Sequence, residues 1–187
     1  WPSAGIDGII YKEMEGDLPG PAPAARTDSF YADFHAPKLQ MEFNYLRNPV
    51  FKNYQPDTGR GELTLHGTER TINEAASPTW IGIRQKAFQI MLNAKMRAET
   101  GADGMKAGVT AYYNYEYHYD LFFTRQAGQY KVQLAKHVHD IYMTAASIDV
   151  KDGSEIEFQI RADRKKYTFL FKNGTSEQFT ELGTGLT

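Results

Sequence analysis

The chain has 187 residues, 41% of them hydrophobic, and 21 Lys and Arg against 23 Asp and Glu give it a formal net charge of -2. This length fits one domain of ordinary size with a tail, and the near balance of charge gives no general attraction to nucleic acid or anionic membranes. The chain has no cysteine, which excludes disulfides, thiolate nucleophiles and cysteine-based zinc sites. No apolar run approaches the roughly 20 residues that a membrane span needs.

The first residues contain neither an initiator methionine nor a basic region followed by an apolar stretch, so the sequence shows no signal peptide. We expect the numbering to start inside a longer protein. Closely spaced prolines then follow, and they forbid helix and favour an extended chain. We therefore expect residues 1–15 to be the remnant of a preceding domain and residues 16–29 to be a stiff linker. The alternative is a disordered tail.

From Phe30 onwards, apolar and polar residues alternate with the period of half-buried strands. The segments with this pattern are 39–44, 61–67, 88–96, 107–112, 117–124, 130–134, 141–150, 156–160 and 167–171. Turn signals separate several of them, including Gln126–Gln129 and Asn173-Gly174. The pattern predicts an all-β fold over residues 30–187, an antiparallel β-sandwich. We expect residues 81–96 and 107–119 to be adjacent strands of one sheet.

Residues 86–99 lack glycine and proline and are open to a helical alternative. A helix would place Phe88, Met91, Leu92 and Lys95 on one face. That stripe is less apolar than the face that the two-residue period produces, so the segment is predicted to be a strand.

Three groups of residues, in this order, resemble one known family. They are Pro37–Asn44 with Asn48-Pro49, Ser77–Gln85, and Ala107–Tyr112 with Tyr117–Tyr119. They resemble the C-terminal concanavalin A-like β-sandwich of two-domain family 43 glycoside hydrolases, the β-xylosidase and α-L-arabinofuranosidase type. The resemblance spans nearly the whole chain. It implies a concanavalin A-like jelly roll that follows a five-bladed β-propeller, of which residues 1–15 would be the last segment.

The resemblance also implies where the chemistry lies. Propellers of this family resemble inverting glycosidases, which need a general acid and a general base on opposite sides of the sugar. Those carboxylates would precede residue 1, so we expect no catalytic residue in this chain. The expected partner is the upstream catalytic propeller, and the expected substrates of the whole protein are xylan- or arabinan-type oligosaccharides. We favour a bacterial protein in the periplasm or outside the cell.

Two departures from the family pattern affect this interpretation. Met41 and Phe43 stand where the family often has tryptophans. The chain ends at Gly183–Thr187, whereas the family usually continues into a further loop and a closing strand. We therefore expect the closing strand of the sandwich to be missing.

Three groups of residues are candidate sites of chemistry. Carboxylates at Asp149, Asp152, Glu155 and Glu157 flank a turn and fit a solvated strand edge better than a catalytic pair. His137 and His139 are predicted to share a strand face, a spacing that can chelate zinc or copper, but no third ligand follows. A structural calcium is conceivable at Asp28, Asp33 and Asp163, although no spacing marks a binding loop. We predict no cofactor.

Sugar binding is the other candidate function of the chain itself. Sugars present apolar faces to aromatic rings and hydroxyls to planar polar groups. The residues of the right types are Trp80, Arg84, Gln85, Tyr112 and Tyr115. Tyrosine is also common in any sheet for reasons of packing, so a structural role is the alternative. Three functions stay open: a non-catalytic accessory domain, an independent carbohydrate-binding module and a lectin-like or structural adhesion sandwich.

Overall fold

The computed structural model describes residues 29–98, 102–151, 155–174 and 176–187, so the expected propeller remnant and nearly all of the expected linker lie outside the described residues. Residues 33–187 form one compact unit. Its elements are the 3-10 helix η1 (Phe51–Asn53) and the strands β1 (Tyr54–Asp57), β2 (Glu62–Leu65), β3 (Ile90–Met96), β4 (Lys106–Asn114), β5 (Tyr117–Gln126), β6 (Gln129–Val138), β7 (Ile141–Val150), β8 (Ile156–Ala162), β9 (Lys166–Asn173) and β10 (Thr180–Leu186). Within the described part of the chain, no helix is long and apolar enough to cross a membrane.

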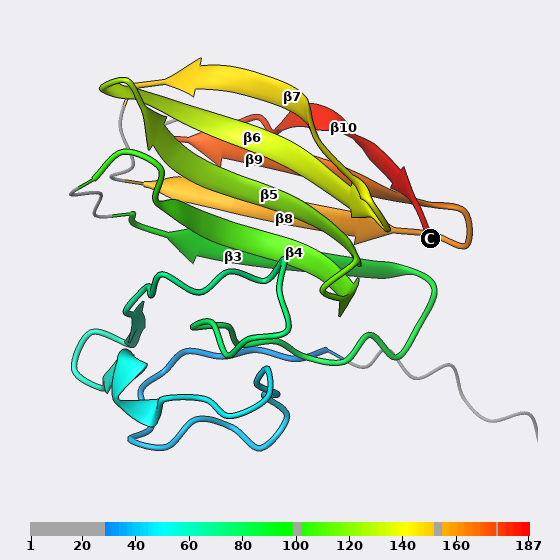
Figure 1. Cartoon of the computed structure of the whole chain (residues 1–187). Helices are drawn as coiled ribbons and strands as arrows, with labels where there is room; N and C mark the ends of the chain where they lie inside the picture. The colour runs from blue at the N-terminus through cyan, green and yellow to red at the C-terminus, as the bar shows by residue number, and fades with distance from the viewer. Residues whose placement is uncertain (1–28, 99–101, 152–154, 175) are drawn as a thin grey trace, which may run out of the picture. The chain divides into compact units, whose positions relative to one another are not determined.

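Two four-stranded antiparallel sheets lie face to face as the layers of a sandwich (Figure 1). One sheet has the order β10-β9-β8-β3 and the other the order β4-β5-β6-β7, while β1 and β2 form a separate hairpin. The predicted all-β sandwich is confirmed.

The core lies between the two sheets and follows the two-residue period of the strands. In the β4–β7 sheet, Leu121 is opposite Leu134 and Phe123 is opposite Val132. All four side chains are fully buried. The facing sheet contributes the buried side chains of Ile156, Phe158, Ile160, Phe169, Phe171 and Leu182. The alternation predicted for residues 117–124 therefore describes β5, whose Leu121 and Phe123 face the core.

The turn between β5 and β6 fixes the register of that core. Its central residues, Ala127 and Gly128, both have positive φ, 49° and 77°. Two such residues in a two-residue loop are typical of a type I′ turn, whose twist matches that of the flanking strands. Gln126 is then opposite Gln129, as the turn signal predicted.

The prediction of a strand at residues 39–44 is wrong. This segment forms a turn, with the amide of Phe43 donating to the carbonyl of Gln40, and only a single bridge joins Asn44 to Gly82. Met41 is 99% exposed. Alternation describes a strand only where a neighbouring strand accepts its hydrogen bonds, and in this loop a turn takes that place.

The prediction that residues 81–96 and 107–119 pair in one sheet is also wrong. β3 pairs with β8, whereas β4 pairs with β5 in the other sheet. Pairing with β8 places Leu92 opposite Ile160 and Met96 opposite Ile156, which brings apolar side chains together on the inner face. The chain crosses from one layer to the other between β3 and β4 (Figure 1).

The sequence does not predict β10, because its glycines obscure the alternation. Gly183 has a φ of 153°, and the register shifts between Glu181 and Gly183. At Gly185, a Cβ atom would lie 2.6 Å from Cε2 of Tyr119, so only glycine lets the strand approach that ring. Whether a closing strand follows β10 stays a prediction.

The turn between β8 and β9 is held by Asp163. Its Oδ1 accepts hydrogen bonds from the amides of Lys165 at 2.7 Å and Lys166 at 3.0 Å. These bonds, and the charges of the two lysines, hold the pKa of the Asp163 carboxyl below its usual value. A carboxyl with a lowered folded-state pKa stabilises the fold above its unfolded pKa, and that stability is lost as the pH falls through the folded value.

We expect Asp163→Asn to lower the melting temperature at pH 7, and the difference from the parent to shrink as the pH falls below about 4. Melting curves of both proteins from pH 7 to pH 2 measure this. A difference that stays constant with pH would contradict the assigned role of the carboxylate.

Candidate functional site

A row of five rings crosses the outer face of the β4–β7 sheet, and we call Trp80, Tyr112, His118, His137 and Tyr142 the ring row. Register aligns Tyr112 with His118, His118 with His137, and His137 with Tyr142 on β4 to β7. Centroid distances between successive rings are 5.6, 5.7, 4.9 and 5.5 Å. These spacings are those of favourable ring contacts, so the row links a loop to all four strands.

A chain of hydrogen bonds lies beneath the ring row. Oδ1 of Asp120 accepts a bond from the Thr110 hydroxyl at 2.8 Å and lies 2.9 Å from Nδ1 of His118. Nε2 of His118 lies 3.1 Å from Nδ1 of His137. His118 and Asp120 are buried, with exposed fractions of 3% and 8%. Buried polar groups joined in this way stabilise a fold only while every member keeps its partner.

With both imidazoles neutral, the chain of bonds fixes which ring nitrogens carry the protons. The Asp120 carboxylate only accepts, so His118 carries its proton on Nδ1 and accepts at Nε2 from a protonated Nδ1 of His137. Both nitrogens of His118 are then engaged, and the hydroxyl of Thr110 is turned to Asp120. The arrangement therefore resembles a structural network more than a nucleophile with its base, in which an imidazole nitrogen must face the hydroxyl.

Trp80 is fixed in the ring row from the loop side. The hydroxyl of Tyr54 donates to the carbonyl of Trp80 at 2.9 Å and accepts from the amide of Trp80 at 3.0 Å. Tyr54 is itself buried. Both backbone polar groups of Trp80 are thus satisfied by one side chain, which sets the position of the indole against Tyr112.

The other end of the outer face is covered by Lys106. Its Nζ lies 4.9 Å from the ring centroid of Phe122 and 3.0 Å from the hydroxyl of Tyr142. A cation over an aromatic face is attracted to it, and the lysine stem shields the phenyl ring. This accounts for the burial of Phe122 on an outer face.

Burial of the Tyr112 ring raises the pKa of its hydroxyl, against the opposing influence of Arg47.

The five predicted sugar-binding residues do not converge on one place. Trp80 and Tyr112 contact each other in the ring row, at an interplanar angle of 47°. Gln85 accepts a hydrogen bond from the Tyr167 hydroxyl at 2.8 Å and donates to the carbonyl of Ala87 at 2.8 Å, so it ties the loop to β9. Arg84 is exposed. Tyr115 lies in the turn between β4 and β5.

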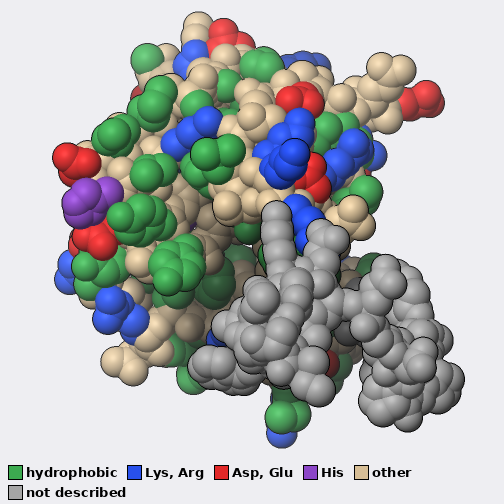
Figure 2. All heavy atoms as spheres, turned by 90° about the vertical axis from the view of Figure 1, so that its right-hand side faces the viewer, with side chains coloured by type: hydrophobic (Ala, Val, Ile, Leu, Met, Phe, Trp, Pro, Cys, Tyr) green, Lys and Arg blue, Asp and Glu red, His purple; other side chains and the backbone are tan. Residues whose placement is uncertain are grey.

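Tyr115 belongs to an exposed apolar end of the β4–β7 sheet. The half-exposed or exposed side chains at this end are Tyr113, Tyr115, Tyr117, Val138 and Ile141. Figure 2 views this end of the sandwich and shows hydrophobic side chains gathered beside a histidine. His139 stacks on Tyr117 with 6.3 Å between ring centroids.

The expectation that His137 and His139 share a strand face is wrong. β6 ends at Val138, and His139 has a φ of 57° in the following turn, where its amide donates to the carbonyl of Glu116. Its ring therefore turns toward Tyr117, while His137 contacts His118. Among the described residues, no group of three His, Asp or Glu could hold a metal ion. Of the conceivable calcium ligands, Asp28 lies outside the described residues, and Asp163 holds the β8–β9 turn.

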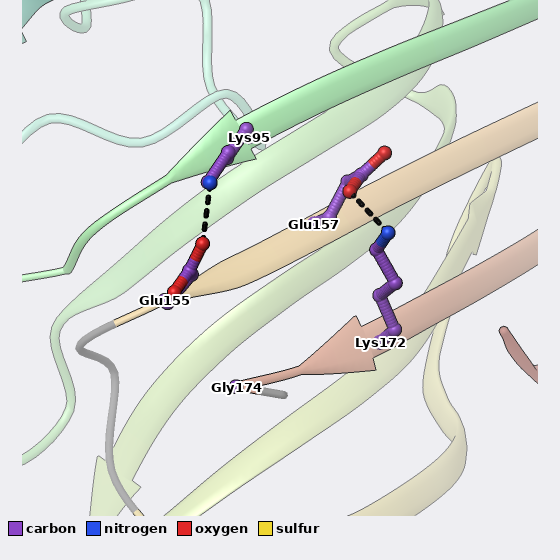
Figure 3. Close-up of a pocket in the computed structure, with 5 residues that line it drawn as sticks. All are labelled: Lys95, Glu155, Glu157, Lys172 and Gly174. Atoms are coloured by element: carbon purple, nitrogen blue, oxygen red, sulfur yellow. Dashed lines mark ion pairs between the residues drawn. The ribbon is translucent and has the colours of Figure 1, made fainter. Parts of the chain in front are cut away.

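A hollow lies on the outer face of the other sheet, lined by Lys95, Glu155, Glu157, Lys172 and Gly174. Figure 3 shows Lys95 directed at Glu155 and Lys172 directed at Glu157. The ion pair with Lys95 lowers the pKa of Glu155, and Glu155 raises that of Lys95. Glu157 lies 2.7 Å from Lys172. Each carboxylate already has a cation, so the hollow fits a solvated ion-pair network. Of the other two members of the predicted acidic cluster, Asp149 pairs with Lys131, and Asp152 lies outside the described residues.

Sequence reasoning missed the centre of the ring row. Neither His118 nor Asp120 stood out in the sequence as a candidate site residue. The turn at Gln126–Gln129 could have revealed their place. It fixes which residues of β5 and β6 are opposite each other, and it pairs His118 with His137. Lys106 and Tyr142 come from more distant strands, and no short-range pattern connects them.

The stacked antiparallel sheets define a concanavalin A-like β-sandwich. The chain belongs to the family of β-xylosidase C-terminal concanavalin A-like domains, whose model matches residues 31–186. The resemblance seen in the sequence is confirmed.

The chain matches parts of longer proteins. The chain is 27% identical over 173 residues to the non-reducing end α-L-arabinofuranosidase BoGH43B of Bacteroides ovatus, covering 92% of this chain and 32% of that protein. A solved structure described as the Bacteroides ovatus xyloglucan PUL GH43B matches with a TM-score of 0.77 at 26% identity, over 100% of this chain and 36% of the other.

A third match supports the fold alone. The xylan β-1,4-xylosidase from Bacillus halodurans C-125 has a TM-score of 0.77 at 21% identity, over 89% of this chain and 33% of that one. The chain thus spans about a third of the length of the relatives that it matches.

Proposed function

We propose that this chain is the non-catalytic C-terminal β-sandwich of a family 43 glycoside hydrolase acting on xylan- or arabinan-type oligosaccharides. Its role is to pack on the upstream catalytic propeller and support it. The observation that carries the proposal is the extent of the match, since the C-terminal domain model covers residues 31–186 while the chain covers only 32% of the arabinofuranosidase relative. The remaining length of such a relative is ample for a catalytic domain.

The polar residues of the chain support a structural role. An inverting glycosidase needs two carboxyl groups roughly 6.5–9.5 Å apart, with room for water between them. Glu155 and Glu157 are each held by a lysine, and Asp120 is held by Thr110 and His118. These carboxylates are engaged in contacts that stabilise strands.

The supporting role is tested in the longer protein, with and without residues 31–186. We expect removal of the sandwich to lower both the melting temperature of the catalytic domain and its rate on aryl xylosides or arabinofuranosides, because docked surface becomes exposed to water. Thermal unfolding and initial rates measure the two effects. A shortened protein that keeps both values would refute the supporting role.

The second candidate is an independent carbohydrate-binding module. This function is favoured by the contact between the partly exposed rings of Trp80 and Tyr112, because aromatic rings bind the apolar faces of sugars. Affinity electrophoresis of the chain in gels with and without xylan separates the two functions. Retardation by xylan would favour the binding module, and unchanged mobility would reject it.

A further inference from the structure

The strand β7 is a long, exposed sheet edge. It ends the order β4-β5-β6-β7, and eight of its ten residues are exposed. Proteins usually protect such edges with lysines, prolines, β-bulges or covering loops. β7 contains no lysine, arginine or proline, and its single charged side chain, Asp149, is paired with Lys131 of β6. The half-exposed apolar side chains along it include Ile141, Met143 and Ile148.

A β-bulge sets which side chains of β7 share a face. The register with β6 shifts between Leu134, opposite Ala146, and Ala135, opposite Thr144, so Ala145 is an extra residue. The bulge reverses the alternation at that point. The side chains on the core side are therefore Ile141, Met143, Ala146, Ile148 and Val150, and those on the outer side are Tyr142, Thr144, Ser147 and Asp149.

With the bulge, the pattern of inward and outward side chains along β7 is the same from either end of the strand. From either end, apolar side chains point inward and side chains that carry a hydroxyl or carboxyl group point outward, up to an alanine: Ile141 to Ala145 forward, and Val150 to Ala146 in reverse. Without the bulge, equivalent positions from the two ends would lie on opposite faces, because faces alternate with a period of two. The bulge thus gives the edge a pseudo-twofold pattern about the Ala145-Ala146 bond.

We propose that β7 is the interface of a homodimer, in which the β7 strands of two copies pair antiparallel about a twofold axis at Ala145-Ala146. An isologous interface needs a surface that is complementary to itself. This register places Ile141 opposite Val150 of the second copy, Met143 opposite Ile148 and Thr144 opposite Ser147. Apolar side chains then meet on the core side and polar ones on the outer side. The two four-stranded sheets become one sheet of eight strands.

The other free edge near β7 does not offer this match. β10 also ends its sheet (Figure 1), but its sequence from Thr180 to Leu186 has no such symmetry, and its register is broken between Glu181 and Gly183. A second copy of the chain is therefore the occupant that β7 fits. The proposal is independent of the catalytic role of any other domain.

Two matched double variants test the register. Thr144→Lys with Ser147→Lys places lysine opposite lysine twice across the axis, whereas Thr144→Lys with Ser147→Glu places lysine opposite glutamate twice. Both pairs change the same exposed positions, and both remove the Ser147 hydroxyl that accepts from Gln133, so they differ at position 147 alone, where the charge has the opposite sign. Like charges directly opposite destabilise a strand pair, and opposite charges stabilise it.

Sedimentation at increasing protein concentration gives the oligomeric state of the parent chain and both variants. We expect a dimer for the parent and the Lys/Glu variant, and a dissociation constant at least about tenfold higher for the Lys/Lys variant. A parent that stays monomeric overturns the proposal. Equal dimerisation of the two variants places the interface elsewhere, and loss of the dimer in both rejects this register.

An engineered disulfide between the two copies tests the same register without introducing charged side chains. The chain has no native cysteine, so Thr144→Cys with Ser147→Cys supplies the only thiols. Paired residues of an antiparallel ladder have Cα atoms about 4.5 to 5.5 Å apart, within the range of a disulfide. We expect oxidation to give a covalent dimer, and Tyr142→Cys with Ser147→Cys, which is out of register, to give much less. Equal yields from the two variants would contradict the register.

Discussion

Phe158→Ala is expected to lower the free energy of unfolding by about 3 to 5 kcal/mol, the usual cost of emptying a buried phenyl site. Phe158 is fully buried in the β8 strand. It is opposite Ala94 of β3 and Phe171 of β9, so both neighbouring strands lose contacts. The free energy of unfolding of a domain of this size is about 5–15 kcal/mol. The variant would therefore lose a large share of its stability.

Urea unfolding followed by tryptophan fluorescence measures the effect. The control is Met41→Ala, because Met41 is 99% exposed and exposed truncations usually change stability by less than about 0.5 kcal/mol. If Phe158→Ala and Met41→Ala cost the same, the core would not lie between the two sheets as described.

Asp120→Ala is expected to lower the free energy of unfolding by about 2 to 4 kcal/mol, because it leaves one buried and one half-buried donor without a partner and each such loss costs about 1–3 kcal/mol. The donors are the hydroxyl of Thr110 and Nδ1 of His118. His118 is 3% exposed, so water cannot easily replace the carboxylate. The loss should also disturb the contact of His118 with His137.

Asp120→Asn is the matched variant, because its side-chain oxygen can still accept at the same place. We expect its loss of stability to be clearly smaller than that of Asp120→Ala, with urea unfolding as the measurement. Equal losses would show that the carboxylate contributes by its charge and not by accepting hydrogen bonds. An Asp120→Ala protein as stable as the parent would refute the structural role of the ring row network.

The local features of the fold follow from the sequence, and the long-range ones do not. The two-residue period separates Leu121 and Phe123 from Asp120 and Phe122, and the Ala127-Gly128 turn fixes the next strand. The choice of partner for β3 depends on side chains that lie far away in the sequence. For example, Asn93 of β3 accepts a hydrogen bond from Gln159 of β8, 66 positions later. Alternation carries no information about such pairing.

The candidate site illustrates the same limit. Trp80 and Tyr112 were predicted because aromatic residues stand out in a sequence. Of their partners, His118 did not stand out in the sequence, and His137 was considered only with His139 as a metal ligand. The register of three strands places both in one row. His139 was misplaced because a single residue with positive φ ends the strand and turns its ring away. The site is defined by strand register, which a single sequence specifies only weakly.

The most direct test of the proposed function is the rate at which the purified 187-residue chain hydrolyses aryl β-xylosides and aryl α-L-arabinofuranosides, beside the longer protein with its upstream region restored. The account predicts no turnover above buffer by the chain and clear turnover by the longer protein. Saturable turnover by the chain alone would contradict it, because the catalytic carboxylates would then have to lie within residues 1–187.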